Sequence, residues 1–114
     1  MMFKRGELLL VPFPFTDFSA VKRRPVIALT TPDSYGDLIA LPVTSRPQVQ
    51  HGIPLLPADL VHGHLPAPSW IRTDRVVTLN ATLVVKSVGQ VTDRAVDAAV
   101  KRLCTLIGYP GPKL

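Results

Sequence analysis

Three consecutive cations precede a proline early in this sequence, as Lys22, Arg23, Arg24 and Pro25. Pro25 disfavours helical conformation at the residue before it, so Arg24 is held extended where a loop meets an apolar run. A guanidinium fixed at such a junction can bind a phosphate through its planar fork of N–H groups. The tetrapeptide alone is more typical of a solvated charge run at the start of a strand.

Two hydroxyl side chains, Thr44 and Ser45, end a second apolar run, and Arg46 follows them. The hydroxyls can donate hydrogen bonds to phosphate oxygens, and Arg46 adds a positive charge. Ser and Thr are also common in the turns that end strands, so this segment alone is a weak indication of a binding site.

One residue separates Arg72 from Asp74, which places both side chains on one face if this segment is a strand. The pair could perform acid–base chemistry on a phosphodiester, or it could be a surface ion pair that contributes little stability. Trp70 could stack on a nucleobase or lie half-buried in the core. Metal-free RNA cleavage needs a base, an acid and cations around the phosphate, and the three segments together contain such groups.

Short apolar runs interrupted by prolines predict a mainly β chain that would position these segments. The expected strands are Glu7–Phe13, Pro25–Thr31, Asp37–Thr44, Ile53–Leu56, Ser69–Leu79 (with a possible kink) and Lys86–Val91. Loops are expected over Thr16–Arg24 and Pro57–Pro68, and a turn or short helix over Asn80–Val85. Pro42 cannot donate to a ladder, so its end of the strand is expected to be an edge or a bulge.

A single amphipathic helix is predicted near the C-terminus. Thr92 is a suitable N-cap, and Asp93 favours the positive end of the helix dipole. Apolar residues recur with helical spacing at Val96, Val100, Leu103 and Ile107. Gly108 then supplies the residue after the helix end. The expected fold is therefore a small barrel or rolled sheet capped by one helix.

Length and composition limit the class of protein. With 114 residues, the chain is expected to form one domain over 1–114. A net charge of +5 favours anionic partners, although a basic surface kept for solubility is an alternative. Cys104 is the only cysteine, which excludes a disulfide scaffold, and the histidines lack convincing metal-ligand spacing. No apolar run could span a membrane and no signal peptide is evident, so a cytoplasmic protein is expected.

The chain resembles the MazF/PemK family of type II toxins over nearly its whole length. The similar stretches are KRGELLLVPFPFTDFSAVKRRPVIALTT, DLIALPVTSRP, SWIRTDRVVTLN and KSVGQVTDRAVDAAVKRLCTLIG. The resemblance implies an SH3-like barrel of the CcdB/MazF type with a C-terminal helix, working as a homodimer. It also implies an endoribonuclease without metal or cofactor that cleaves single-stranded RNA to 2′,3′-cyclic phosphate and 5′-hydroxyl ends. An acidic, partly disordered antitoxin is the expected inhibitor.

Carried over residue by residue, the resemblance makes Arg24 and Thr44 catalytic, with Asp74 as the base and Arg72 as the acid. Further residues are expected to bind RNA: Lys22, Arg23, Ser45, Arg46 and Trp70. Two alternatives remain open at this point. One is a non-catalytic toxin like CcdB, which shares this fold and poisons DNA gyrase through its C-terminal helix. The other is an inactive family member that only binds RNA or an antitoxin.

Overall fold

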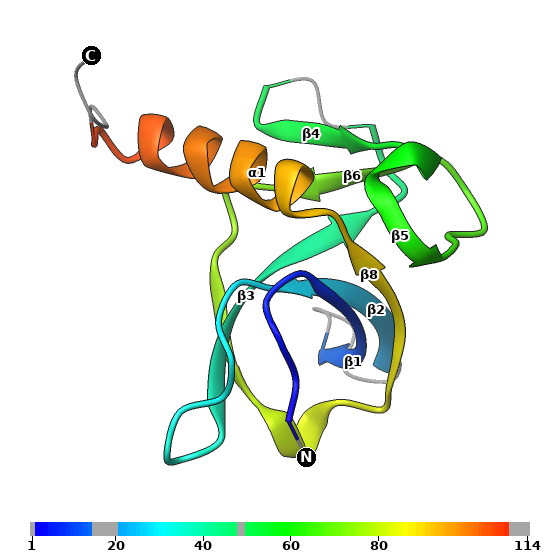
Figure 1. Ribbon diagram of the computed structural model, residues 1–114, viewed down its shortest axis with the longest axis vertical. Coiled ribbons are helices and arrows are strands. Elements are labelled where there is room, and N and C mark those ends of the chain that lie inside the picture. The colour runs from blue at the N-terminus through cyan, green and yellow to red at the C-terminus, as the bar shows by residue number, and fades with distance from the viewer. Residues whose placement is uncertain (1, 15–20, 48–49, 110–114) are drawn as a thin grey trace.

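The computed structural model describes residues 2–14, 21–47 and 50–109. Within these residues the chain forms one antiparallel sheet of eight strands and then a C-terminal helix (Figure 1). The strands are β1 (Glu7–Pro14), β2 (Val21–Ala28), β3 (Asp37–Thr44), β4 (Gly52–Leu55), β5 (Leu60–Gly63), β6 (Ser69–Arg72), β7 (Val77–Asn80) and β8 (Lys86–Val91). The helices are the short 3₁₀ helices η1 (Pro57–Asp59) and η2 (Ala81–Leu83), and α1 (Asp93–Leu106).

The order of strands across the sheet is β4-β6-β3-β2-β1-β8-β5, and β7 pairs with β3 beside this path. β3 therefore changes partner along its length: residues 37–40 pair with β7, whereas Val43 and Thr44 pair with β6. The sheet curls into a half-barrel and α1 lies across one side of it (Figure 1). The predicted class, mainly β with one C-terminal helix, is confirmed.

Apolar side chains pack on both faces of the sheet. Because side chains alternate along a strand, Leu8 and Ile27 point to the face covered by α1, while Leu9 and Val26 point to the opposite face. The first core includes the helix residues Val96 and Ala99. The second core is closed by other parts of the chain, among them Phe3, Leu79 and Ala81. Arg24 and Thr44 also lie on this second face, because they alternate in the same way along β2 and β3.

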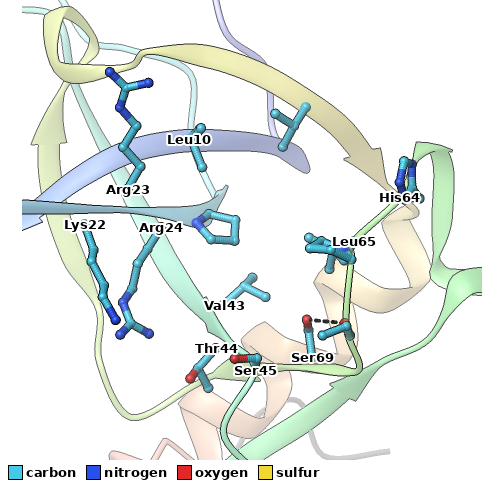
Figure 2. A pocket seen from close by; sticks show the side chains of 14 residues that line it. Leu10, Lys22, Arg23, Arg24, Val43, Thr44, Ser45, His64, Leu65 and Ser69 are labelled. Atoms are coloured by element: carbon cyan, nitrogen blue, oxygen red, sulfur yellow. Dashed lines mark hydrogen bonds between the residues drawn. The ribbon is translucent and has the colours of Figure 1, made fainter.

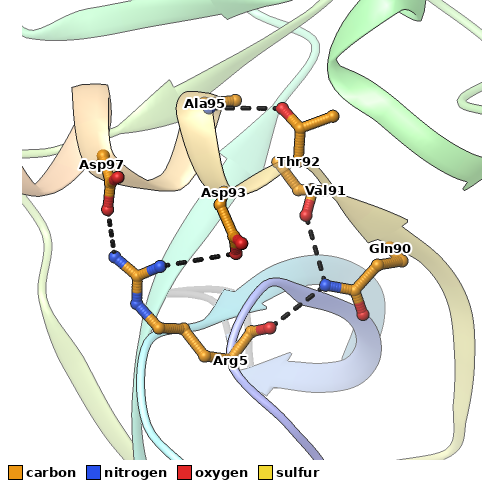
Figure 3. Close-up of polar contacts among 7 residues, drawn as sticks. All are labelled: Arg5, Gln90, Val91, Thr92, Asp93, Ala95 and Asp97. Atoms are coloured by element: carbon orange, nitrogen blue, oxygen red, sulfur yellow. Dashed lines mark hydrogen bonds and ion pairs between the residues drawn. The ribbon is translucent and has the colours of Figure 1, made fainter.

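The start of α1 is fixed by polar contacts with the N-terminal segment (Figure 3). The Thr92 hydroxyl caps the helix by accepting from the Ala95 N–H at 3.3 Å. Arg5 contacts Asp97 at 2.7 Å and Asp93 at 3.7 Å. The predicted N-cap is therefore confirmed, and Asp93 in the first turn and Asp97 in the second also hold the N-terminal segment against the helix.

The end of α1 differs from the predicted apolar stripe. Val96 is buried and Val100 and Leu103 are half-buried, but Ile107 is 71% exposed and follows the last helical residue. Gly108 has a positive φ, as expected for the residue that ends a helix. Among the described residues, no helix has the length and hydrophobicity of a membrane span.

Two predicted loops contain strands. β2 begins at Val21, so Lys22 to Arg24 lie in a strand paired with β1, not in the predicted loop over 16–24. Residues 16–20 of that loop lie outside the described residues. β2 also ends at Ala28, three residues before the predicted Thr31. Likewise β5 lies inside the predicted irregular segment 57–68, where a strand of four residues pairs with β8 although prolines and a glycine interrupt the segment.

The predicted single strand Ser69–Leu79 is wrong, because the chain turns after Arg72 and forms β6 and β7 separately. The buried Thr73 hydroxyl donates to the His51 carbonyl at this turn, which fixes the end of β6 against the residue preceding β4. The edge predicted at the Pro42 end of β3 is confirmed on the side of β2. The β2–β3 ladder ends at the Val26–Pro42 pair, and beyond it Val43 and Thr44 pair with β6 alone. The strands predicted over Asp37–Thr44 and Lys86–Val91 are confirmed at both ends.

Candidate functional site

An opening lies between β2 and β3. The two strands are paired only from Ala28 to Val26, and the last pair is Val26 with Pro42. Beyond that pair, β2 continues along β1 while β3 continues along β6. Pro42 ends the ladder and Pro25 would come next, and neither has an N–H to donate. The two prolines therefore favour separation of the strands at this point.

Arg24 and Thr44 lie on the two sides of this opening. Each is two residues beyond the Val26–Pro42 pair on its own strand, and each shares the face of the second core. Lys22 lies on the same face as Arg24, and Figure 2 shows their side chains extending side by side while Arg23 extends in the opposite direction. Because side chains alternate along a strand, Lys22 and Arg24 point to the face that carries Thr44.

The opening leads into a cavity of about 450 Å³ (Figure 2). Its apolar wall is formed by residues of β1, β2, β3, β8 and the segment before β6: Leu10, Pro25, Val43, Val88, Leu65, Pro66 and Ala67. Its polar lining consists of Lys22, Arg23, Arg24, Thr44, Ser45, His64 and Ser69. An apolar interior with a few polar groups at one side is typical of a ligand site.

Thr44 has a defined hydrogen-bonding state. Its side chain is at the buried end of β3, with the residue 8% exposed, and its Oγ1 accepts from the Arg46 backbone N–H at 3.1 Å. A hydroxyl has one proton to donate as well as lone pairs to accept with. Since the Arg46 N–H uses one lone pair of this oxygen, the geometry of that hydrogen bond leaves the hydroxyl proton able to point elsewhere.

Trp70 extends the polar face across a third strand. It is the direct partner of Thr44 in the β3–β6 ladder, so both side chains point to the same face. The neighbouring Ile71 points into the first core, which places Arg72 on the face of Trp70. Arg24, Thr44, Trp70 and Arg72 therefore share one face of the sheet, on the side away from α1.

Arg72 and Asp74 form an ion pair at the end of this face. Arg72 Nη2 lies 2.7 Å from Asp74 Oδ2, and each side chain is 23% exposed. The hydrogen bonds from Arg72 hold the pKa of the Asp74 carboxyl below its ordinary value, against a smaller opposing effect of burial. Asp74 is therefore ionised at neutral pH, as the sequence-based hypothesis requires.

The structure brings together some of the sequence-predicted residues and leaves others apart. Five of them line the cavity: Lys22, Arg23, Arg24, Thr44 and Ser45. Among the described residues, the remaining predicted ones, Arg46, Trp70, Arg72 and Asp74, are not part of that lining. Trp70 and Arg72 instead extend the shared face, and Arg46 acts on Thr44 through its backbone.

Sequence reasoning missed the wall contributed by residues 64–69. His64 and Leu65 lie in a proline-rich segment with no regular pattern, and Ser69 stands at a predicted strand start. Only the pairing of β5 with β8 and of β6 with β3 brings this segment to face β2. A local pattern carries no signal for such a placement.

No metal site is evident in the part of the chain that the structure describes. Within residues 2–14, 21–47 and 50–109, no three His, Cys, Asp or Glu side chains form a group that could hold an ion. Cys104 is half-buried on α1.

Solved structures that share this fold include toxins and toxin–antitoxin complexes. MazE–MazF from Deinococcus radiodurans has a TM-score of 0.76 at 19% identity, covering 93% of this chain and 96% of the other. An endoribonuclease in complex with its cognate antitoxin, from a mycobacterial species, has a TM-score of 0.70 at 18% identity, covering 96% and 99%. The Mycobacterium tuberculosis toxin MazF-mt6 has a TM-score of 0.67 at 16% identity, covering 89% and 95%. At these identities the similarity establishes the fold.

Sequence comparison establishes the family. No curated protein is significantly similar in sequence to this chain. The family model of PemK-like, MazF-like toxins, however, matches residues 4–107, which include all the strands and α1. The matched range also contains the opening between β2 and β3 and the Arg72–Asp74 pair. The chain belongs to the family of PemK-like, MazF-like toxins of type II toxin–antitoxin systems.

Proposed function

We propose that this chain is a toxin that cleaves single-stranded RNA without a metal and is neutralised by a cognate antitoxin. The observation that carries the proposal is the placement of Arg24 and Thr44 on the two sides of the β2–β3 opening, with Lys22 beside Arg24. Family membership supports the toxin role, and a similar fold occurs in a mycobacterial endoribonuclease.

The first part of the proposed mechanism is stabilisation of the phosphate. Attack on phosphorus by the neighbouring 2′-oxygen places extra negative charge on the non-bridging oxygens. Arg24 can donate two N–H groups to these oxygens, and the Thr44 hydroxyl can donate a third hydrogen bond. These donors are held in position by strands, so little reorganisation is needed as the charge develops.

The second part is proton transfer. Asp74 takes the proton of the 2′-OH, the 2′-oxygen bonds to phosphorus, and the bond from phosphorus to the 5′-oxygen breaks. Arg72 supplies a proton to the departing 5′-oxygen, and the proton held by Asp74 then passes to Arg72 across their 2.7 Å contact. The products are a 2′,3′-cyclic phosphate and a 5′-hydroxyl, and both residues return to their starting charge.

The proposed partners follow from the charge of the chain and from the half-buried Trp70. The net charge of +5 supports salt-dependent binding of RNA, and Trp70 offers a ring on which an unpaired base can stack. Lys22, Arg23, Ser45 and Arg46 would contact the backbone of the strand. An acidic, partly disordered antitoxin would compete for the same cations. We further propose a homodimer acting in the cytoplasm without a cofactor.

An RNA digest tests this function. The wild type and Arg24→Ala are incubated with a long unstructured RNA in the presence of EDTA, and cut sites and end chemistry are mapped. We expect discrete cuts ending in cyclic phosphate for the wild type and their loss in the variant. Arg94→Ala removes one positive charge from the exposed surface of α1 and serves as the matched control.

Three outcomes would contradict parts of the proposal. Absence of cleavage by folded wild type would leave a gyrase-binding toxin or an inactive family member, and a gyrase inhibition assay separates these. Cleavage that EDTA abolishes would refute the metal-free mechanism. Unchanged cleavage in Arg24→Ala would show that the chemistry takes place elsewhere.

A further inference from the structure

We infer that the cavity behind the β2–β3 opening is a specificity pocket for one unpaired nucleobase, with a preference for bases that carry an exocyclic amino group. The inference rests on the proposed function and extends it to the choice of cut site. It is carried by three features of the cavity: its apolar wall, its cationic mouth and the orientation of one buried hydroxyl.

The cavity has the volume and the apolar lining that a planar aromatic ring requires. The volume of about 450 Å³ lies within the range of small-ligand sites, about 300 to 1,000 Å³. Leu10, Val43, Leu65 and Val88 line it with aliphatic carbon from four separate parts of the chain. Val43 is held by the first core, and Leu65 and Val88 pack against that core, so the wall is supported from behind. A base inserted here would exchange water for hydrocarbon on its faces.

The mouth has a charge that favours an attached phosphate. Lys22, Arg23 and Arg24 lie along one side of the cavity, and none of the described lining residues is acidic. A nucleotide combines a flat ring with a phosphate a few bonds away, so the ring can occupy the wall while the phosphate meets these cations. Of these cations, Arg24 is the one proposed to hold the scissile phosphate, so the pocket would take a base close to the cut.

The Ser69 hydroxyl provides the discrimination. Ser69 is 8% exposed, and its Oγ donates to the Ala67 carbonyl at 2.9 Å. With its proton used, the oxygen presents only lone pairs to the cavity. At the corresponding ring position, adenine and cytosine carry an amino group that donates, whereas guanine and uracil carry a carbonyl that accepts. An acceptor in this place favours adenine and cytosine and repels the other two bases.

The first test is the sequence of the cut sites. A random-sequence RNA is digested with the wild type, Ser69→Ala and Leu65→Trp, and the bases around each cut are counted. We expect the wild type to favour adenine or cytosine at one fixed position by about tenfold, the ratio that one good hydrogen bond supports. Ser69→Ala should lower the ratio of cuts at preferred sites to cuts at other sites towards one, and Leu65→Trp should remove cleavage at preferred sites by filling the pocket.

A second tryptophan substitution, placed on the surface, is the control for the variant that fills the pocket. Leu56→Trp adds the same ring at a position that is 57% exposed and outside the lining, and it should leave the cut sites unchanged. Thermal unfolding of each variant identifies any that fails to fold. A wild-type preference that both Ser69→Ala and Leu65→Trp retain would overturn the pocket while leaving the nuclease function standing.

The second test does not depend on cleavage. Binding of AMP, CMP, GMP, UMP and inorganic phosphate to the wild type is measured by NMR titration. We expect AMP and CMP to bind more tightly than GMP and UMP, and inorganic phosphate to shift only the signals near the cations. Loss of AMP binding in Leu65→Trp with retained phosphate binding would support the pocket even if no RNA is cut. Equal binding of AMP by the two proteins would overturn it.

Discussion

Arg72 and Asp74 are joined by two hydrogen bonds, from Nε to Oδ1 at 3.1 Å and from Nη2 to Oδ2 at 2.7 Å. This parallel geometry orients both groups at the end of the face that carries Thr44 and Trp70. It also fixes the charge of the carboxylate, because the ionised form receives both hydrogen bonds. The pair therefore links the stability of the protein to pH.

The pKa of the Asp74 carboxyl is lower in the folded state than in the unfolded state. Its ionised form therefore stabilises the fold at pH values above the unfolded-state pKa, and this contribution is lost as pH falls through the folded-state pKa. We expect Asp74→Asn to lower the free energy of unfolding near pH 7 by at most about 1 kcal/mol, since the pair is partly exposed to solvent. Urea unfolding across the acidic range measures this. The gap between wild type and variant should narrow below the ordinary pKa of aspartate, and Arg72→Ala should show the same narrowing. A gap that is constant with pH would contradict the assignment.

Replacement of Thr44 separates its two hydrogen-bonding roles. Thr44→Ser keeps the hydroxyl that accepts from Arg46 and donates outward, so we expect cleavage within a few-fold of wild type. Thr44→Val keeps the shape but removes the donor, and loss of one such donor costs about 10²- to 10³-fold in rate. Single-turnover cleavage of a fixed RNA measures both rates. Equal rates for the two variants would show that the hydroxyl does not act on the phosphate.

Replacement of Pro42 tests the origin of the opening. Pro42→Val supplies an N–H at the last β2–β3 pair and a residue that favours strands, so we expect the ladder to lengthen and the opening to narrow. The protein should stay as stable or gain stability, while cleavage falls by up to about 100-fold because a shift of about 1 Å misplaces Arg24 and Thr44. Hydrogen exchange at residues 42–44 and the cleavage rate are the measurements. Full activity with a protected new amide would show that strand separation is not required.

Two glycines with the same backbone conformation differ in their surroundings. Gly6 has φ +88° and a Cβ there would lie 2.9 Å from the Val91 carbonyl oxygen, whereas Gly108 has φ +90° and nothing within 4 Å of such a Cβ. Gly108→Ala should cost about 1 kcal/mol for the conformation alone, and Gly6→Ala clearly more because the β1–β8 connection must also shift. Thermal and urea unfolding compare them. Equal destabilisation would mean that the Val91 contact relaxes freely.

Two strands and the helix cap were predictable from sequence. Asp37–Thr44 and Lys86–Val91 match their strands at both ends, and Thr92 caps α1 as expected. In these segments the local residue pattern predicts the same secondary structure that the neighbouring strands and the helix impose. The predicted start of β2 was too late because Lys22 and Arg24 disfavour a buried strand. In the structure the C-terminal part of β2 is buried, and the part with these two cations is held by pairing with β1.

The site was predictable in part. Arg24 and Thr44 stand beside prolines and apolar runs that mark them, and the resemblance to known toxins singled them out. Their mutual position depends on where β2 and β3 separate, which is a property of two strands and not of either alone. Ser69 and Leu65 carry no marking in the sequence, since their importance arises only from the segments that β5 and β6 bring across the opening.

The pairing of β1 with β8 has a consequence for biosynthesis. Glu7 lies opposite Gln90, so the first strand obtains one of its two neighbours only after nearly all the matched residues have been synthesised. Contacts between such distant parts of a chain form late and slow the folding of small β proteins. The cavity also requires both Leu10 and Val88. A nascent chain on the ribosome therefore cannot assemble its site, so the proposed RNA cleavage would begin only after synthesis of the chain is nearly complete.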